Sequence, residues 1–213
     1  MAIPVKDSGG GDFKKCPPGV HAAVCDMVVN QGIQRGEWKG QEKNLEKVYL
    51  RFEVPKERVE YDKDGQHFNR PISIGLTLTN SLGEKANLRK FLESWRGRQF
   101  TAEELQNFDL TAILGKPCML TVEHKTKGDK TYANITAITK YSPIMKIAGT
   151  DVPVEMPLAE MPVLGYHPEF QAETYEHLPE WLRKIIDSRI LPEGHTVGAS
   201  AESQDFTDDD IPF

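Results

Sequence analysis

Positively charged and aromatic side chains occur together in several polar segments of the chain. Cations contact phosphates and exposed aromatic rings stack on nucleobases, and the combination is typical of surfaces that hold single strands without reading their sequence. We therefore predict that single-stranded DNA is contacted by Arg35, Trp38, Lys39, Lys43, Lys47, Tyr49, Arg51, Tyr61, Lys63, Lys125, Lys127, Lys130 and Tyr132.

These side chains also have a structural interpretation. Trp38 lies between Glu37 and Lys39 with glycines close by, but its ring can still fold onto the body of the domain. Tyr49 can lie beneath the C-terminal part of the chain, and lysines in loops are most often only solvated. The sequence leaves both interpretations open.

The chain ends in three carboxylates, a stiff Ile-Pro step and a phenylalanine. An apolar pocket rimmed by Arg or Lys in another protein can take the Phe213 ring and pair with its carboxylate and with the aspartates. An acidic terminus that only improves solubility has no need of Ile-Pro-Phe. We therefore predict a partner-binding tip made of Asp208, Asp209, Asp210, Ile211, Pro212 and Phe213.

Charge is segregated along the chain. The formal net charge is −6, but residues 1–147 carry a net +5 and residues 148–213 a net −11. A basic body with an acidic tail indicates that the two parts meet different partners, the body a polyanion and the tail a basic surface.

We find no pattern typical of an active site or a metal site. The six histidines are scattered, no glycine-rich phosphate loop is present, and Asp62 and Asp64 have no further acidic partners nearby. The three cysteines lack metal-ligand or disulfide spacing, and we interpret Cys25 and Cys118 as small apolar strand residues. We expect a protein that is not an enzyme and needs no metal or other cofactor.

Five segments have strand character: residues 20–29, 45–54, 67–79, 118–124 and 131–141. In the second segment apolar residues take every other position from Val48 to Val54, which predicts a half-buried strand ended by Pro55. Long polar loops are expected over 30–44 and 56–66, the latter turning at Asp64-Gly65.

Helices are predicted between the third and fourth strands. Ser81 and Glu84 form a capping-box pattern before a helix over 85–96, which Gly97 ends. Phe91 and Trp95 share one helical stripe, which favours core packing. A second box at 101–104 opens another helical stretch. Arg96 and Arg98 flank the first helix end, where capping of carbonyl groups explains them as well as phosphate binding does.

Three strands, a helical insertion and two strands follow the order of the OB-fold, a five-stranded, partly open barrel that binds oligonucleotides. Another small α+β sheet would leave the same pattern. We predict a mainly β chain with four parts: a flexible N-terminal arm (1–18), the OB-like domain (19–143), an irregular extension with a short helix over 179–187 (144–191), and a flexible linker with the acidic tip (192–213).

The tip carries a family resemblance. Residues 205–213 resemble the C-terminal tip of bacterial single-stranded-DNA-binding proteins, which docks replication, repair and recombination enzymes. Residues 86–98, with Phe100-Thr101 and 114–117, resemble phage-encoded replication proteins of the same class. The resemblance implies a phage protein that coats single-stranded DNA in an infected bacterial host. The insertion over 88–98 and the short linker depart from the bacterial proteins, so their tetramer does not carry over and the oligomeric state stays open.

The alternative is a protein-only adaptor, whose barrel binds another protein and whose tail imitates the host tip. No stretch approaches the roughly 20 apolar residues of a membrane helix, and the start lacks the apolar core of a secretion signal. We expect a cytoplasmic protein.

Overall fold

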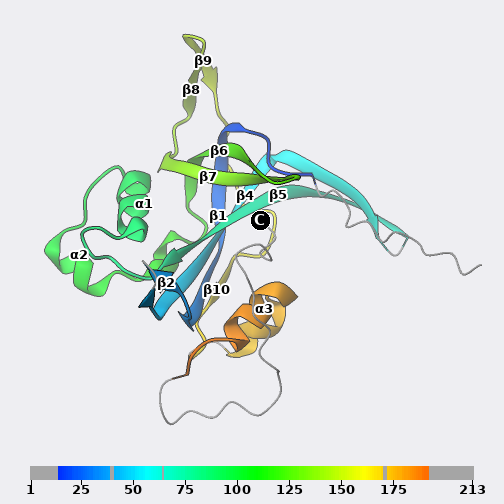
Figure 1. Cartoon of the computed structure of the whole chain (residues 1–213). Coiled ribbons are helices and arrows are strands. Elements are labelled where there is room, and N and C mark those ends of the chain that lie inside the picture. The colour runs from blue at the N-terminus through cyan, green and yellow to red at the C-terminus, as the bar shows by residue number, and fades with distance from the viewer. Residues whose placement is uncertain (1–13, 39–40, 64, 170–171, 192–213) are drawn as a thin grey trace, which may run out of the picture.

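The computed structural model describes residues 14–38, 41–63, 65–169 and 172–191. Its main sheet has the strand order β5-β4-β1-β6-β7, in which all neighbours are antiparallel (Figure 1). The bounds are Gly19–Gln34 for β1, Leu45–Lys63 for β4, Gln66–Thr79 for β5, Pro117–Lys127 for β6 and Lys130–Lys140 for β7. The prediction of a mainly β chain is confirmed.

The larger core lies between the inner face of this sheet and helix α1 (Asn87–Arg96). The alternation predicted for the second strand is confirmed, because Leu50 and Phe52 are fully buried on the core side. Trp95 of α1 packs its ring 5.5 Å from that of Phe52, between centroids, and Phe91 lies beside both. Core packing of Phe91 and Trp95 is therefore confirmed. Cys25 and Cys118 are buried strand residues, as predicted.

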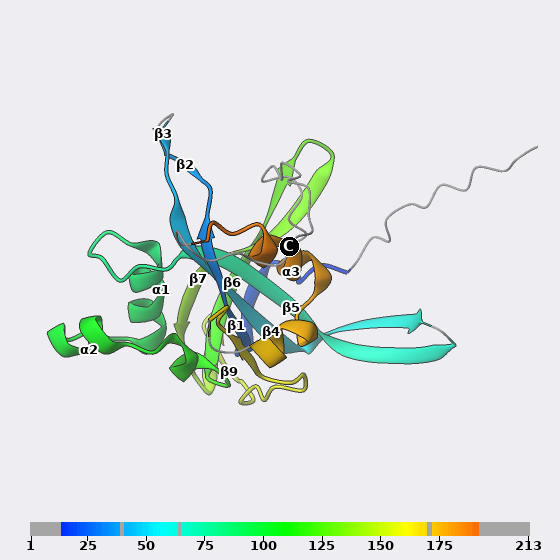
Figure 2. The same cartoon turned by 90° about the horizontal axis from the view of Figure 1, so that it is seen from below.

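The strands are longer than predicted, and Pro55 does not end the second one. A register shift between Val54 and Arg58 marks a bulge, after which β4 and β5 pair again as far as Lys63 and Gln66. A bulge accommodates proline because the residues in it need not donate to the ladder. Residues 56–63 therefore form one side of a projecting arm, and the prediction of a loop there was wrong (Figure 2).

One predicted helix start is wrong and the other is confirmed. Ser81 Oγ accepts from the Gly83 amide instead of capping a helix, and α1 begins only at Asn87. Gly97 ends α1 in the left-handed conformation, at φ 69°. Thr101 caps α2 (Ala102–Asn107) with the reciprocal Glu104 contact of a capping box, and a 3₁₀ helix, η1 (Leu110–Ile113), follows.

The C-terminal extension is more regular than predicted and packs on the sheet. Strand β10 (Leu164–Tyr166) pairs in parallel with β1, and α3 (Glu180–Asp187) confirms the predicted short helix. A second core forms where Leu182 and Ile186 of α3 meet Met27 and Val29. The other elements of the extension are β8 (Ile144–Ile147), β9 (Thr150–Pro153) and the 3₁₀ helix η2 (Ala172–His177).

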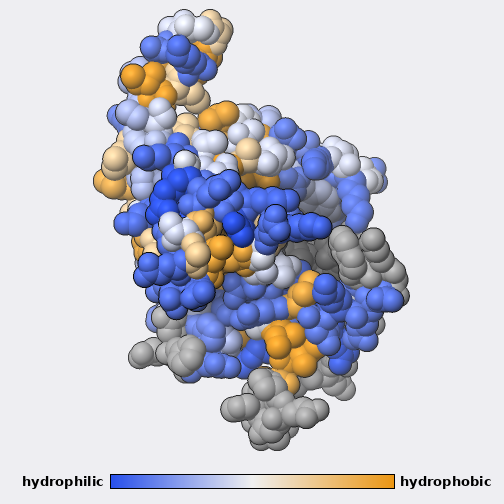
Figure 3. Space-filling model, turned by 90° about the vertical axis from the view of Figure 1, so that its left-hand side faces the viewer, coloured by the Kyte–Doolittle hydropathy of each residue, from blue (hydrophilic) through white to orange (hydrophobic). Residues whose placement is uncertain are grey.

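The hairpin β8–β9 projects from the body and carries hydrophobic side chains among polar ones (Figures 1 and 3). Ile144 and Ile147 are 52% and 51% exposed. An exposed two-stranded hairpin gains little from its own packing. This part of the extension, which was predicted to be irregular, nevertheless forms a regular β-hairpin.

The last residues of the predicted N-terminal arm are fixed against the body. Cys16 is buried in the main core, and its carbonyl oxygen accepts from His124 Nε2 at 2.8 Å. Lys14 Nζ donates to the Arg58 carbonyl oxygen. The expectation of a loose arm is thus wrong for residues 14–18, while residues 1–13 and the linker and tip over 192–213 lie outside the described residues. No helix in the described ranges is long and apolar enough to cross a membrane.

Candidate nucleic-acid interface

The projecting β4–β5 arm carries an aromatic and cationic ladder on one face. Tyr61 pairs with Phe68 across the hairpin and Val59 pairs with Arg70, so the side chains of all four point to the same side. The Tyr61 and Phe68 rings are stacked, with centroids 5.2 Å apart and planes 17° apart. The Arg70 guanidinium lies 5.0 Å from the Phe68 ring centroid. Tyr61 is 39% exposed.

Polar contacts on the opposite face brace the arm. Arg58 donates to the Asn69 side chain at 2.7 Å and to Glu160 at 2.5 Å, which ties the arm to the C-terminal extension. Nearer the tip, His67 pairs with Asp62 at 2.9 Å. Because the carboxylates lie on this side, the aromatic face is separated from them by the thickness of the hairpin.

The β6–β7 hairpin presents the second group of predicted contacts. Lys125 pairs with Tyr132 and Lys127 with Lys130, which places all four side chains on one face. The three lysines are exposed and Tyr132 is half-buried. Gly128 occupies the tight turn with φ 59°, a conformation that favours glycine. The structure thus brings together four of the predicted site residues, in a geometry suited to contacting successive phosphates.

The third group lies around the small hairpin of β2 (Glu37–Trp38) and β3 (Gln41–Glu42). Arg35 and Lys43 are exposed at its base, where the Lys43 amide donates to the Gly36 carbonyl at 2.6 Å. This hairpin and the β6–β7 hairpin project to the same side of the molecule, while the arm leaves in another direction (Figure 2). Lys39 lies outside the described residues, as do the side chains of Trp38 and Lys63.

Tyr49 is a correction, because it does not face solvent. Its ring meets Trp181 of α3 edge-on, with centroids 5.1 Å apart, and its exposed fraction is 9%. Gly75 makes room for it on the neighbouring strand, since a Cβ there would lie 2.2 Å from the Tyr49 hydroxyl oxygen. Burial raises the pKa of the Tyr49 phenol to about 12. The alternative interpretation, burial beneath the C-terminal segment, is the correct one.

Arg51 and Lys47 on the same strand are also engaged within the protein. Arg51 donates to Asp26 at 2.8 Å, and Asp26 is fully buried. Burial raises the pKa of Asp26, and the Arg51 guanidinium opposes that shift. Lys47 Nζ contacts the Thr79 hydroxyl at 3.2 Å. The predicted role of Arg51 as a phosphate contact is therefore wrong in this arrangement, because its guanidinium is paired with a buried carboxylate.

The extension closes over this face further along β4. Glu53 is fully buried, and its two carboxylate oxygens accept from the backbone amides of Glu160 and Met161 at 2.7 and 3.0 Å. Charge-assisted bonds of this kind hold a loop firmly. The outer face of β4 from Tyr49 to Glu53 is thus an intramolecular contact surface.

Arg96 and Arg98 flank the end of α1, and Arg98 donates to the carbonyl oxygen of Gln99 at 3.3 Å. Both pair with Glu104 of α2, and hydrogen bonds from Arg98 and the Thr101 amide hold the pKa of that carboxyl well below its usual range. The Arg96 guanidinium also lies over the Phe100 ring, 4.4 Å from its centroid. These arginines join α1 to α2.

Two ladder residues, Phe68 and Arg70, were missed in the sequence. Counting outward from the predicted Asp64-Gly65 turn pairs residue 63 with 66 and residue 61 with 68, so the position of the turn was enough to predict these pairs. They were missed because the run before the turn was interpreted as a loop.

No protein-family model matches the chain, and comparison with curated proteins gives no match. Within the described ranges, no group of three or more His, Cys, Asp or Glu side chains is placed to hold a metal ion.

Proposed function

We propose that the protein binds single-stranded DNA along the β4–β5 arm and the β6–β7 hairpin, and recruits partner proteins through residues 208–213. The observation that carries the proposal is the exposed Tyr61–Phe68–Arg70 ladder. Base stacking on an aromatic side chain contributes about 1–3 kcal/mol and tolerates any sequence, since every base has a π face. The lysines of the β6–β7 hairpin supply contacts to the backbone phosphates.

We also assign the sheet to the OB-fold. The strand order β5-β4-β1-β6-β7 with α1 inserted between β5 and β6 supports this assignment. Closure is supported by the approach of β5 and β7 to within 8 Å between Cα atoms, without a ladder of hydrogen bonds. The hairpins that carry the predicted DNA contacts then correspond to the loops around the mouth of a barrel.

In this proposal the acidic tip recruits partner proteins. Three aspartates beside Ile211, Pro212 and Phe213 suit a pocket with an apolar floor and a basic rim. The charges raise the association rate, and burial of the phenylalanine contributes about 1.5–3 kcal/mol. Such a peptide docks reversibly, as expected of a recruiting element.

A competition gel shift tests the DNA-binding half. The intact chain is mixed with labelled oligo-dT in dilute buffer and challenged with unlabelled oligo-dT, duplex DNA or oligo-rU. We expect oligo-dT to compete far better than the duplex, because stacking needs unpaired bases. Equal competition by the duplex would contradict the proposed use of the ladder.

The adaptor alternative is favoured by one observation, the exposed apolar side chains of the extension. Ile144 and Ile147 lie on the β8–β9 hairpin, and Leu158 is 73% exposed. On this alternative the chain captures partner enzymes but produces no shift of oligo-dT at low salt. Substitution of Ile144 and Ile147 by Ser would then abolish partner capture, whereas the DNA-binding proposal expects capture to depend on Phe213.

A further inference from the structure

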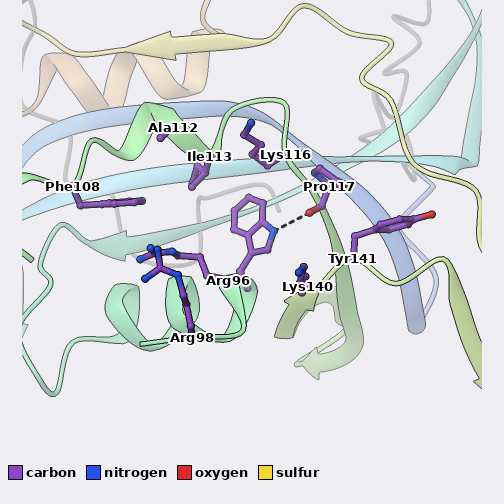
Figure 4. Close-up of a pocket in the computed structure, with 10 residues that line it drawn as sticks. Arg96, Arg98, Phe108, Ala112, Ile113, Lys116, Pro117, Lys140 and Tyr141 are labelled. Atoms are coloured by element: carbon purple, nitrogen blue, oxygen red, sulfur yellow. Dashed lines mark hydrogen bonds between the residues drawn. The ribbon is translucent and has the colours of Figure 1, made fainter. Parts of the chain in front are cut away.

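A cavity of about 500 Å³ opens beside α1 (Figure 4), and α1 lies on the other side of the molecule from the β4–β5 arm (Figure 2). Its apolar lining comes from Trp95, Phe108 and Ile113. The Trp95 indole donates to the Pro117 carbonyl at 2.9 Å, so its only polar hydrogen is satisfied and its ring presents carbon to the cavity. On the face that carries α1 and α2, hydrophobic surface is ringed by hydrophilic residues (Figure 3).

The rim of this cavity is strongly positive. Arg96 and Arg98 lie toward one side, and Lys116 and Lys140 toward the other (Figure 4). Glu104 pairs with both arginines, so its single negative charge is shared by two of the four cations. Lys116 and Lys140 are exposed, and neither forms an ion pair with any described residue. An apolar floor with unbalanced cations at the rim fits an acidic peptide that carries an aromatic side chain.

We propose that this cavity, here called the α1 pocket, is a docking site for the chain's own residues 208–213. The Phe213 ring occupies the space between Trp95, Phe108 and Ile113. The three aspartates lie along the rim, where their charge matches the excess of cations. The chemistry that suits the tip to a partner's pocket is therefore present within the protein itself.

The length of chain between the body and the tip permits this docking. The described residues end at Leu191, and 22 residues follow as far as Phe213. A Gly- and Ser-containing linker of this length spans about 26 Å on average. A compact body of this size has a radius of gyration of about 16 Å. The tip therefore reaches around the body without full extension.

Docking in the α1 pocket has a consequence for recruitment. A docked tip is withheld from other proteins, so a partner must compete with the pocket for Phe213. The tip would also lie away from the Tyr61–Phe68–Arg70 ladder and the β6–β7 lysines, so docking does not require the DNA contacts to be vacant. This differs from direct competition of the tail with DNA for one groove.

Paramagnetic relaxation enhancement on the full chain tests the proposal. Cys16, Cys25 and Cys118 are buried, and burial raises the pKa of the Cys16 thiol to about 12, so a new surface cysteine is labelled selectively. A nitroxide on Thr207→Cys in a ¹⁵N-labelled chain should broaden the amide signals of Ala112, Lys116 and Lys140. Broadening should fall in 1 M salt, where the Debye length is about 3 Å.

Matched variants decide what causes the broadening. Phe213→Ala should abolish it without touching the body, and so should the double substitution Lys116→Glu with Lys140→Glu. The control, Lys85→Glu with Lys90→Glu, makes the same charge change on exposed lysines that do not line the pocket and should leave it intact. The ¹⁵N spectrum shows at the same time whether each variant is folded.

Three results would overturn the proposal. Broadening centred on Tyr61 and Phe68 or on the β6–β7 lysines would place the tip on the DNA surface. Broadening in a ¹⁵N-labelled chain that carries no nitroxide, when it is mixed with a spin-labelled chain that carries no ¹⁵N, would assign the tip to a second copy. Absence of broadening anywhere would show that the tip does not dock on the body.

Discussion

Removal of the ladder rings should weaken binding to single-stranded DNA without weakening the fold. The perturbation is Tyr61→Ala, Phe68→Ala and the pair combined. Both rings lie on the arm beyond the bulge, outside the two buried cores. Their loss therefore removes stacking surface and leaves the core packing in place, so the midpoint of thermal unfolding should change little.

The size of the effect follows from how the rings are arranged. Tyr61 is the more exposed ring, and Phe68 lies stacked against it with Arg70 nearby. One stacked base contributes about 1–3 kcal/mol, and about 1.4 kcal/mol is a tenfold change, so Kd should rise about 5- to 150-fold. Because Phe68 supports the Tyr61 ring, the double variant should lose little more than the stronger single variant.

Fluorescence anisotropy of labelled oligo-dT in dilute buffer measures these affinities. His67→Ala is the matched control, since His67 lies on the opposite face of the same arm and is bonded to Asp62. We expect the control to bind like the unaltered chain. If both aromatic variants bind oligo-dT as tightly as the control does, the ladder is not a stacking surface and the reasoning fails.

Substitutions at the β6–β7 lysines and at two buried contacts should change DNA affinity and stability separately. Lys125→Ala with Lys127→Ala should make the slope of log affinity against log salt shallower by about 1.4, at about 0.7 per lost phosphate contact; an unchanged slope would remove both lysines from the interface. Arg51→Ala leaves Asp26 buried without its cation and should cost about 3–5 kcal/mol in urea unfolding at pH 7. Burial raises the pKa of Asp26, so the folded protein retains the proton more readily than the unfolded chain. The loss of unfolding free energy caused by Arg51→Ala should therefore be smaller near pH 4 and should grow as the pH rises through the raised pKa of Asp26. A loss that is larger at pH 4 than at pH 7 would contradict this pH dependence. Leu182→Ala empties a fully buried position of α3 and should cost about 2–5 kcal/mol, while a cost below about 0.5 kcal/mol would show that α3 does not stabilise the sheet.

The sequence predicted the strands best where one face is buried. Alternation from Val48 to Val54 predicted a strand because each inward position meets the core, and Leu50 and Phe52 do so. Beyond Pro55 the residues from Lys56 to Arg58 are all polar, and the alternation that resumes at Val59 and Tyr61 is too short to mark a strand. The bulge that carries the chain past the proline is a property of pairing with β5, which the sequence does not display locally.

Burial of the outer face of β4 could not be predicted, because the residues that cover it are distant in the sequence. Tyr49 has the pattern of an outward residue on a half-buried strand, but Trp181 lies 132 positions further on and packs against it. Asp26 and Arg51 meet across neighbouring strands in the same way. Residue spacing within one strand gave no means of predicting which outward side chains the extension would bury.

Photo-crosslinking followed by mapping of the attached residues shows which residues of the chain touch single-stranded DNA. The intact chain is irradiated with oligo-dT in dilute buffer, digested, and the crosslinked peptides are identified by mass spectrometry. We predict that thymine attaches at Tyr61 and Phe68, with weaker attachment near Tyr132. Failure to crosslink any residue of the arm while oligo-dT is bound, or failure to bind oligo-dT at all, would contradict the account.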